Sequence, residues 1–195
     1  MYILRKQAGV TLTELIITLS VIAILLSFSA PSYSEFINKR KIVGTANLIG
    51  TFFENVKMES VKRSEWITLT YKESSNGADW CFGAKMGRHK SCDCLADPAV
   101  TDCRLDPGET DNQAMIMSNT SYSGLDDLQT TTTVSSNYHM DFNPVRGTLS
   151  HSEKVIVQIK HSNEDYLIDI SVTPTGRVSK CTPTGHVLIG LPTCI

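Results

Sequence analysis

The sequence predicts an α+β protein in which one long N-terminal helix, transmembrane in its first half, packs on an antiparallel β-sheet head with disulfides. Three observations predict this fold. Twenty uncharged residues, 15–34, lead into a stretch of helical periodicity that reaches residue 63. Short runs that alternate apolar and polar residues follow from residue 64 onward, as in half-buried strands. All six cysteines lie after the uncharged run, in the predicted head.

The composition limits the function classes. The 195 residues include 18 basic and 20 acidic side chains, with a net charge of −2 and a mean hydropathy of −0.08. The length fits one domain with an appendage, and the hydropathy excludes a protein with many membrane spans. The slight acidic excess argues against a protein that binds nucleic acid over its whole surface.

The uncharged run has a basic start and an acidic residue at its head. Arg5 and Lys6 precede it, and as a helix it would rise about 30 Å, enough to cross a bilayer. Glu14 stands where a carboxylate costs about 2–3 kcal/mol in a membrane helix, so it is a candidate functional residue. The alternative is a secreted adhesin or enzyme whose first 30 residues are a conventional signal peptide, for which Glu14 has no use.

The helix is predicted to continue past Pro31, with a kink instead of a stop. Residues 35–63 form the amphipathic part, because apolar residues recur there at spacings of 4, 3, 4 and 3: Ile42, Ala46, Ile49, Phe53 and Val56. The basic residues 39–41 lie mostly off that stripe and are expected on the solvated face. A helix from residue 10 to residue 63 would be about 80 Å long.

Strands are predicted where apolar and polar residues alternate. The strongest predictions are residues 66–71, 155–160 and 166–173, with 161–165 as a hairpin connection between the last two. Weaker predictions are 80–84, 115–117, 138–142 and 176–180. The threonine run 130–133 is β-prone but short. Residues 93–127 are expected to be mainly solvated loop, since they hold eight acidic residues and one basic residue, Arg104.

The cysteines are predicted to form three disulfides, because a head behind an N-terminal anchor is extracytoplasmic. Cys181 and Cys194 stand apart from the others and should pair. Cys92 and Cys94 are too close to bridge each other, so each should pair with Cys81 or Cys103, in either connectivity. The rival is a zinc site of four cysteines with His89, but the gaps of 11, 2 and 9 lack a repeated Cys-x₂-Cys spacing.

No catalytic, cofactor or metal site is predicted. The five histidines are scattered without a defensible partner spacing, and no phosphate-binding loop or His-Glu-x-x-His pattern occurs. The adjacent carboxylates Asp126 and Asp127 are expected to be solvated surface. The sequence therefore points away from an enzyme.

The segment Lys6-Gln7-Ala8-Gly9-Val10-Thr11-Leu12-Thr13-Glu14-Leu15 resembles the class III signal of type IV prepilins and pseudopilins. The resemblance implies that prepilin peptidase cuts between Gly9 and Val10 and that Val10, in place of the more frequent Phe, becomes N-methylated. Glu14 is then the fifth mature residue and pairs with the N-terminal amine of a neighbouring subunit during assembly. Without Arg5 and Lys6 the mature chain has 16 basic and 20 acidic residues, so its net charge is −4.

Three later elements resemble the GspH/FimT/FimU group of minor pilins and pseudopilins. They are Trp80-Cys81-Phe82-Gly83, Phe142-Asn143-Pro144-Val145-Arg146-Gly147-Thr148 and Thr175-Gly176-Arg177-Val178. The type IV pilin fold then divides the chain into a leader peptide (1–9), a transmembrane and assembly helix (10–34), an amphipathic helix (35–63) and an extracytoplasmic β-rich head (64–195).

The resemblance implies a minor type IV pilin that supports pilus assembly, motility and adhesion. It would sit in the bacterial inner membrane with a periplasmic head and then in the pilus at the cell surface. Its partners would be prepilin peptidase, the inner-membrane assembly machinery, and the major and other minor pilins. The alternative within the family is a GspH-type pseudopilin of a type II secretion system.

Double-stranded DNA, bound without sequence preference in natural transformation, is a further partner that the FimT branch implies. The chain has no acidic residue after Ile170 but carries Arg177 and Lys180, the latter displaced by one position from the pattern of that branch. A second basic cluster includes Arg88 and Lys90. Ordinary solubilising charge is the alternative explanation for both clusters. A few phosphate contacts would give salt-sensitive binding.

Overall fold

The structure is a computed structural model that describes residues 9–74, 79–106, 114–120, 128–132, 138–161, 166–186, 188 and 190–194. The side chains of residues 28–32, 128 and 130–132 lie outside this description. The chain divides into two compact units, residues 1–38 and 39–195. The predicted leader lies almost wholly outside the described residues.

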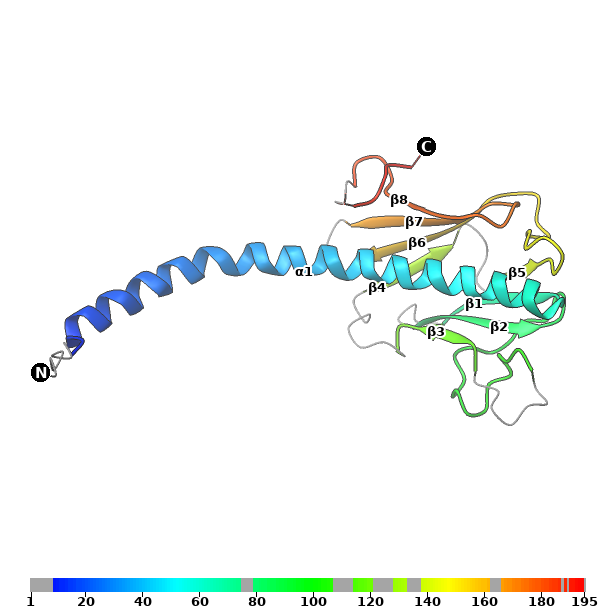
Figure 1. Ribbon diagram of the computed structural model, residues 1–195, viewed down its shortest axis with the longest axis horizontal. Helices are drawn as coiled ribbons and strands as arrows, with labels where there is room; N and C mark the ends of the chain where they lie inside the picture. Colours follow the sequence, from blue (N-terminus) through cyan, green and yellow to red (C-terminus); the bar gives the residue numbers. More distant parts are fainter. Residues whose placement is uncertain are drawn as a thin grey trace, which may run out of the picture. The chain divides into compact units, whose positions relative to one another are not determined.

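A single helix, α1 (Leu12–Arg63), accounts for the predicted helical region, and Pro31 does not end it (Figure 1). The predicted apolar stripe is confirmed, because all five of its members are fully buried: Ile42, Ala46, Ile49, Phe53 and Val56. Lys62 and Arg63 lie in the last turn, where basic side chains interact favourably with the helix dipole. The helix begins at Leu12, two residues after the position that the sequence predicted.

Among its described residues the head holds two four-stranded sheets, each wholly antiparallel. The first has the order β3-β2-β1-β5, and its strands are β1 (Ile67–Glu73), β2 (Trp80–Met86), β3 (Ile116–Ser118) and β5 (His139–Phe142). The second has the order β4-β6-β7-β8, with β4 (Leu128–Thr132), β6 (Val155–His161), β7 (Leu167–Val172) and β8 (Val178–Cys181).

The predicted strands are all present, but they form two sheets and not one. Two antiparallel strand pairs explain this, the observed pair of β1 with β2 and the predicted hairpin of β6 with β7, because each pair recruits its own outer strands. The pairing of Lys160 with Leu167 confirms the hairpin, although residues 162–165 of its connection lie outside the described part. β4 was not predicted as a strand because its threonines give no apolar alternation.

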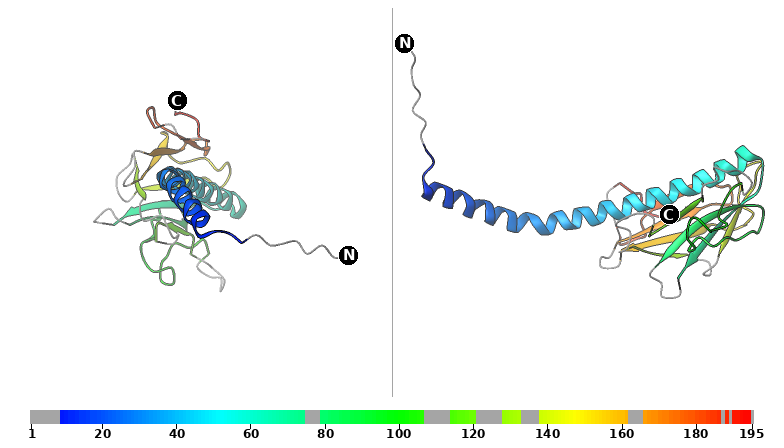
Figure 2. Two further views of the ribbon diagram at one scale, coloured as in Figure 1. Left: turned by 90° about the vertical axis from the view of Figure 1, so that its left-hand side faces the viewer. Right: turned by 90° about the horizontal axis from the view of Figure 1, so that it is seen from below.

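One core joins both sheets to α1. The buried stripe of the helix packs with inward residues of the first sheet, such as Phe82 and Phe142, and of the second, such as Ile159 and Ile170. Phe53 of α1 meets the Phe82 ring edge-on at 5.1 Å between centroids. Figures 1 and 2 show residues 39–63 of α1 running along both sheets. Burial of this stripe at about 25 cal/mol per Å² supplies much of the driving force for docking the helix.

Within the residues that the structure describes, no helix is long and apolar enough to cross a membrane.

Candidate functional site

The N-terminal motif leads directly into α1. Gly9 and Val10 are exposed, and the Thr11 hydroxyl accepts a hydrogen bond from the Glu14 amide at 3.3 Å. Thr11-Leu12-Thr13-Glu14 therefore has the spacing of a helix capping box, with Thr11 as N-cap. The sequence analysis did not identify this cap, although its signal is a threonine three residues before a glutamate at the head of an apolar run. Glu14 thus lies in the first helical turn, where the helix dipole favours a carboxylate.

The first part of α1 exposes its large apolar side chains. Each of them from residue 10 to residue 26 is at least 50% exposed: Val10, Leu12, Leu15, Ile16, Ile17, Leu19, Val21, Ile22, Ile24, Leu25 and Leu26. A helix that is apolar all round is normally covered by lipid or by other helices. This segment therefore has the character of an interaction surface.

Two of the disulfides form a compact knot over β2. Cys81 pairs with Cys94 and Cys92 with Cys103, which selects one of the two predicted connectivities. Gly83 makes room for them, because a Cβ atom there would lie 2.5 Å from Cys103 Sγ. The glycine of the Trp-x-x-Gly element is thus a packing requirement of the knot.

The remaining cysteines, Cys181 and Cys194, pair with each other as predicted. None of the six cysteines is free, so the rival thiolate zinc site does not form.

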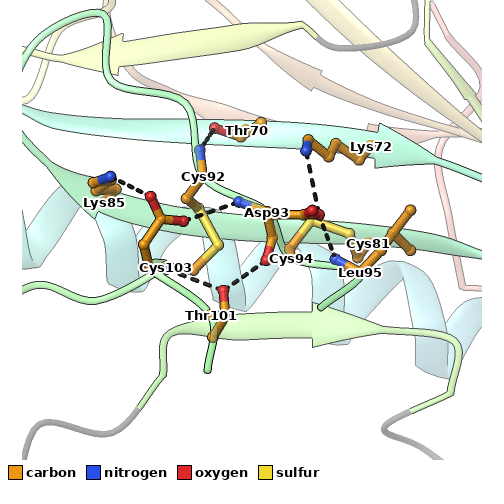
Figure 3. Close-up of polar contacts among 11 residues, drawn as sticks. Thr70, Lys72, Cys81, Lys85, Cys92, Asp93, Cys94, Leu95, Thr101 and Cys103 are labelled. Carbon is orange, nitrogen blue, oxygen red and sulfur yellow. Dashed lines mark hydrogen bonds and ion pairs between the residues drawn. A yellow bond between two sulfur atoms is a disulfide. The ribbon is translucent and has the colours of Figure 1, made fainter. Parts of the chain in front are cut away.

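Polar contacts fix the segment that carries the knot (Figure 3). The Cys92 amide donates to the Thr70 hydroxyl of β1 at 3.3 Å, and Asp93 forms an ion pair with Lys72 at 3.2 Å. The Lys85 ammonium donates to the Asp102 carboxylate and lowers the pKa of Asp102 below its ordinary value. Residues 92–103, the cystine segment, are therefore held to β1 and β2 by hydrogen bonds and ion pairs as well as by the Cys81–Cys94 disulfide.

The four candidate DNA-binding residues lie at two places in the head. Arg177 is exposed just before β8, and the Lys180 ammonium donates to Asn47 Oδ1 of α1 at 2.8 Å. Arg88 and Lys90 follow β2, where the Arg88 guanidinium lies 4.6 Å from the centre of the Trp66 ring. The first pair borders the second sheet and the second pair borders the first sheet.

One cluster was missed by the sequence analysis. His89, His139 and Asp141 bring their side-chain nitrogen and oxygen atoms within 4.8 Å of one another. Fifty residues separate the two histidines, so only the pairing of the strands could reveal their proximity.

The N-terminus of the chain matches a known family model. Residues 4–30 match the family model described as the prokaryotic N-terminal methylation motif. A protein of Haemophilus influenzae named "Uncharacterized protein" is 28% identical over 89 residues, which are 46% of this chain and 52% of that protein. The matched region thus spans about half the length of this relative.

Two solved structures resemble the chain more distantly. Both are crystal forms of the type IV minor pilin FimU from Pseudomonas aeruginosa, each 14% identical to this chain. The first has a TM-score of 0.47 and covers 76% of this chain and 97% of the other; the second has a TM-score of 0.45 and covers 73% and 98%.

The N-terminal motif and the helix that packs on the sheets are continuous in the chain. The matched residues include Gly9, Val10 and Glu14 and continue into the helix that packs on antiparallel sheets in a disulfide-bonded head. In this N-terminal motif, and in a long helix that packs on antiparallel sheets, the chain resembles type IV pilin-like proteins.

Proposed function

We propose that the protein is a minor type IV pilin, which prepilin peptidase cleaves between Gly9 and Val10 and which then enters the pilus and supports its assembly, motility and adhesion. Before assembly, residues 10–34 hold it in the inner membrane with residues 64–195 in the periplasm. Its partners are the inner-membrane assembly machinery, the major pilin and other minor pilins. The observation that carries the proposal is the N-terminal methylation motif in residues 4–30, followed by apolar helix residues that the chain itself leaves exposed.

Glu14 and the new N-terminus would act together during assembly. Cleavage exposes the amine of Val10, a positive group that an uncleaved peptide bond does not offer. A carboxylate that enters an apolar bundle is costly unless a cation neutralises it, and the amine of a neighbouring subunit is such a cation. Processing would therefore gate the entry of the subunit into the fibre.

The head supports a display role. Two of its disulfides tie a loop to a strand, Cys94 to Cys81 of β2 and Cys194 to Cys181 of β8, which would hold these loops in place outside the cell, where disulfides persist. Contact with double-stranded DNA, without sequence preference, is a secondary role for the exposed Arg177 and its neighbour Lys180, and for Arg88 and Lys90. It would be electrostatic and sensitive to salt.

The test replaces Glu14 and follows the subunit into fibres. Glu14→Gln keeps the size of the side chain and removes its charge, while Glu54→Gln changes an exposed glutamate on the same helix and serves as the control. Immunogold labelling of sheared surface fibres should detect the wild type and Glu54→Gln, and should fall at least about tenfold for Glu14→Gln.

Two outcomes would contradict the proposal. If Glu14→Gln entered fibres at the wild-type level, the carboxylate would have no role in assembly. Absence of the wild type from surface fibres, with loss of protein secretion on deletion of the gene, would instead identify the GspH-type pseudopilin of a type II secretion system.

A further inference from the structure

Three side chains on the outer face of the first sheet turn their ligand atoms toward one point. His89 Nδ1 lies 2.8 Å from Asp141 Oδ2 and 3.4 Å from His139 Nε2. Each of the three residues offers one ligand atom, and these atoms all lie within 4.8 Å of one another. Two imidazoles and a carboxylate form a frequent ligand set for transition-metal ions in proteins.

The fold brings these residues together by strand pairing. His139 and Asp141 are two positions apart on β5, so their side chains leave the same face of the sheet. Opposite them on β1 are Thr70 and Thr68. The segment after β2 passes back over these threonines, where the Lys90 amide donates to Thr68 and the Cys92 amide donates to Thr70. His89 lies in this segment, and the Cys92–Cys103 disulfide holds the segment three residues after His89.

Hydrogen bonds hold the Asp141 carboxylate in one orientation. Its side chain is fully buried, and its Oδ1 accepts hydrogen bonds from the Thr68 hydroxyl at 2.6 Å and from the His89 amide at 3.1 Å. Ser150 Oγ lies 3.4 Å from Oδ2. Partners of this kind orient ligands in metal sites, where they leave the other carboxylate oxygen for the ion. Here that oxygen, Oδ2, lies 2.8 Å from His89 Nδ1.

The geometry and chemistry suit zinc. Zn–N and Zn–O bonds of about 2.0–2.2 Å at tetrahedral angles place neighbouring ligand atoms about 3.3 Å apart. The two observed distances, 2.8 and 3.4 Å, lie on either side of this value, and all three ligand atoms lie within 4.8 Å of one another. Calcium and magnesium prefer all-oxygen shells, which this set does not offer. The His89 side chain is 56% exposed, so water can reach the fourth coordination position.

The backbone supplies an independent observation. His89 has a φ of 57°, in the left-handed region that residues other than glycine rarely occupy. Such a conformation costs about 1–3 kcal/mol and is concentrated at functional sites, because surrounding contacts must hold it in place. Two contacts with Asp141 hold His89 in this conformation. The His89 amide donates to Oδ1 at 3.1 Å, and the imidazole Nδ1 lies 2.8 Å from Oδ2.

We propose that His89, His139 and Asp141 bind one zinc ion in the extracytoplasmic head. The ion would tie the segment after β2 to β5 and add a metal link beside the disulfide knot. No metal site was predicted from the sequence, since the ligands come from segments about 50 residues apart and show no local spacing pattern.

The experiment titrates zinc chloride into the full-length chain, held in detergent with all disulfides intact, by isothermal calorimetry. The wild type should bind one equivalent, and His89→Ala and His139→Ala should each bind at least about tenfold more weakly, as even outer-shell changes cost 10–100-fold. His186→Ala, a partly exposed histidine in the C-terminal loop, should bind like the wild type. At about a hundredfold excess over the Kd, zinc should raise the Tm of the wild type by about 5–10 °C.

Folding is checked separately from binding. Each variant is first unfolded by heat without metal, and His89→Ala decides the question if His139→Ala does not fold, because the His89 side chain is largely exposed. No zinc binding by the wild type would overturn the proposal. Equal affinities of the wild type, His89→Ala and His186→Ala would also overturn it, since the zinc would then be held elsewhere on the surface.

Discussion

Gly176 lies against Gly147 so closely that a Cβ atom on Gly176 would fall 1.9 Å from the Gly147 carbonyl oxygen. Gly147 closes the turn after β5 of the first sheet, and Gly176 lies between β7 and β8 of the second sheet. Both have a positive φ, of 61° and 75°. Lys57 of α1 completes the junction, because its ammonium donates to the Gly176 carbonyl at 3.0 Å. The two turns thus join both sheets to the helix.

Replacing Gly176 should weaken this junction. Gly176→Ala adds both a clash with backbone and a strained φ, so it should lower the free energy of unfolding by at least about 2 kcal/mol. Urea unfolding of the full chain measures the change. Gly185→Ala is the control, because Gly185 also has a positive φ, of 98°, but nothing within 4 Å of its Cβ position. Equal losses for the two variants would show that close packing at Gly147 contributes nothing.

The packing of the two disulfides against Gly83 predicts a second loss of stability on replacing a glycine, here without a positive φ. In Gly83→Ala the new methyl group would meet Cys103 Sγ at 2.5 Å and Cys92 Sγ at 2.9 Å. The variant should lose about 1–3 kcal/mol of stability and form the two bridges less completely on oxidative refolding. Peptide mapping by mass spectrometry counts the correct pairs. Gly44→Ala, on α1 with open space around it, should instead gain about 0.5–1 kcal/mol; full pairing in Gly83→Ala would refute the packing argument.

The ion pair of Lys85 with Asp102 predicts an acid dependence. The pKa of Asp102 is lowered in the folded state, chiefly because Lys85 donates to its carboxylate. The pair therefore stabilises the fold above the ordinary Asp value of 3.8 and loses this contribution as the pH falls through the lower folded pKa. Between pH 6 and pH 2 the wild type should lose slightly more stability than Lys85→Met, which lacks the pair throughout. Urea unfolding at both pH values compares them, and parallel losses would contradict the prediction.

The DNA proposal predicts a defined salt dependence. Arg177→Ala combined with Lys180→Ala should weaken the retardation of double-stranded DNA at low salt and reduce the salt slope of log Kd by about 2, one for each phosphate contact. Because Lys180 also donates to Asn47, the stability of the variant is measured in parallel. Lys154→Ala, an exposed lysine outside both clusters, is the control. Unchanged retardation, or none by the wild type, removes DNA as a partner.

Local patterns predicted much of this fold. The 4, 3, 4, 3 spacing identified every buried hydrophobic residue of α1 from Ile42 to Val56, because helical periodicity depends only on neighbouring positions. The pairing of Cys181 with Cys194 followed from sequence separation in the same way. The division into two sheets did not follow, since strand order depends on which hairpin recruits β3, β4, β5 and β8.

The candidate sites differ in the same way: a local motif can be read from the sequence, and a cluster made by long-range pairing cannot. Gly9, Val10 and Glu14 lie in one short motif that the sequence alone displays, and their roles stay predictions. The capping role of Thr11 was visible in the same residues but was overlooked. His89 and His139 meet only through the return of the cystine segment over β1, a long-range arrangement that no local spacing encodes.

Mass spectrometry of the mature N-terminus, on protein purified from its native membrane, shows directly whether the chain is processed as a prepilin. The expected mature chain begins at Val10 and carries one methyl group on its N-terminal amine, with Met1 to Gly9 absent. A chain that begins near Ala30 would contradict it, because the first 30 residues would then be a conventional secretory signal and Glu14 would be lost from the mature protein.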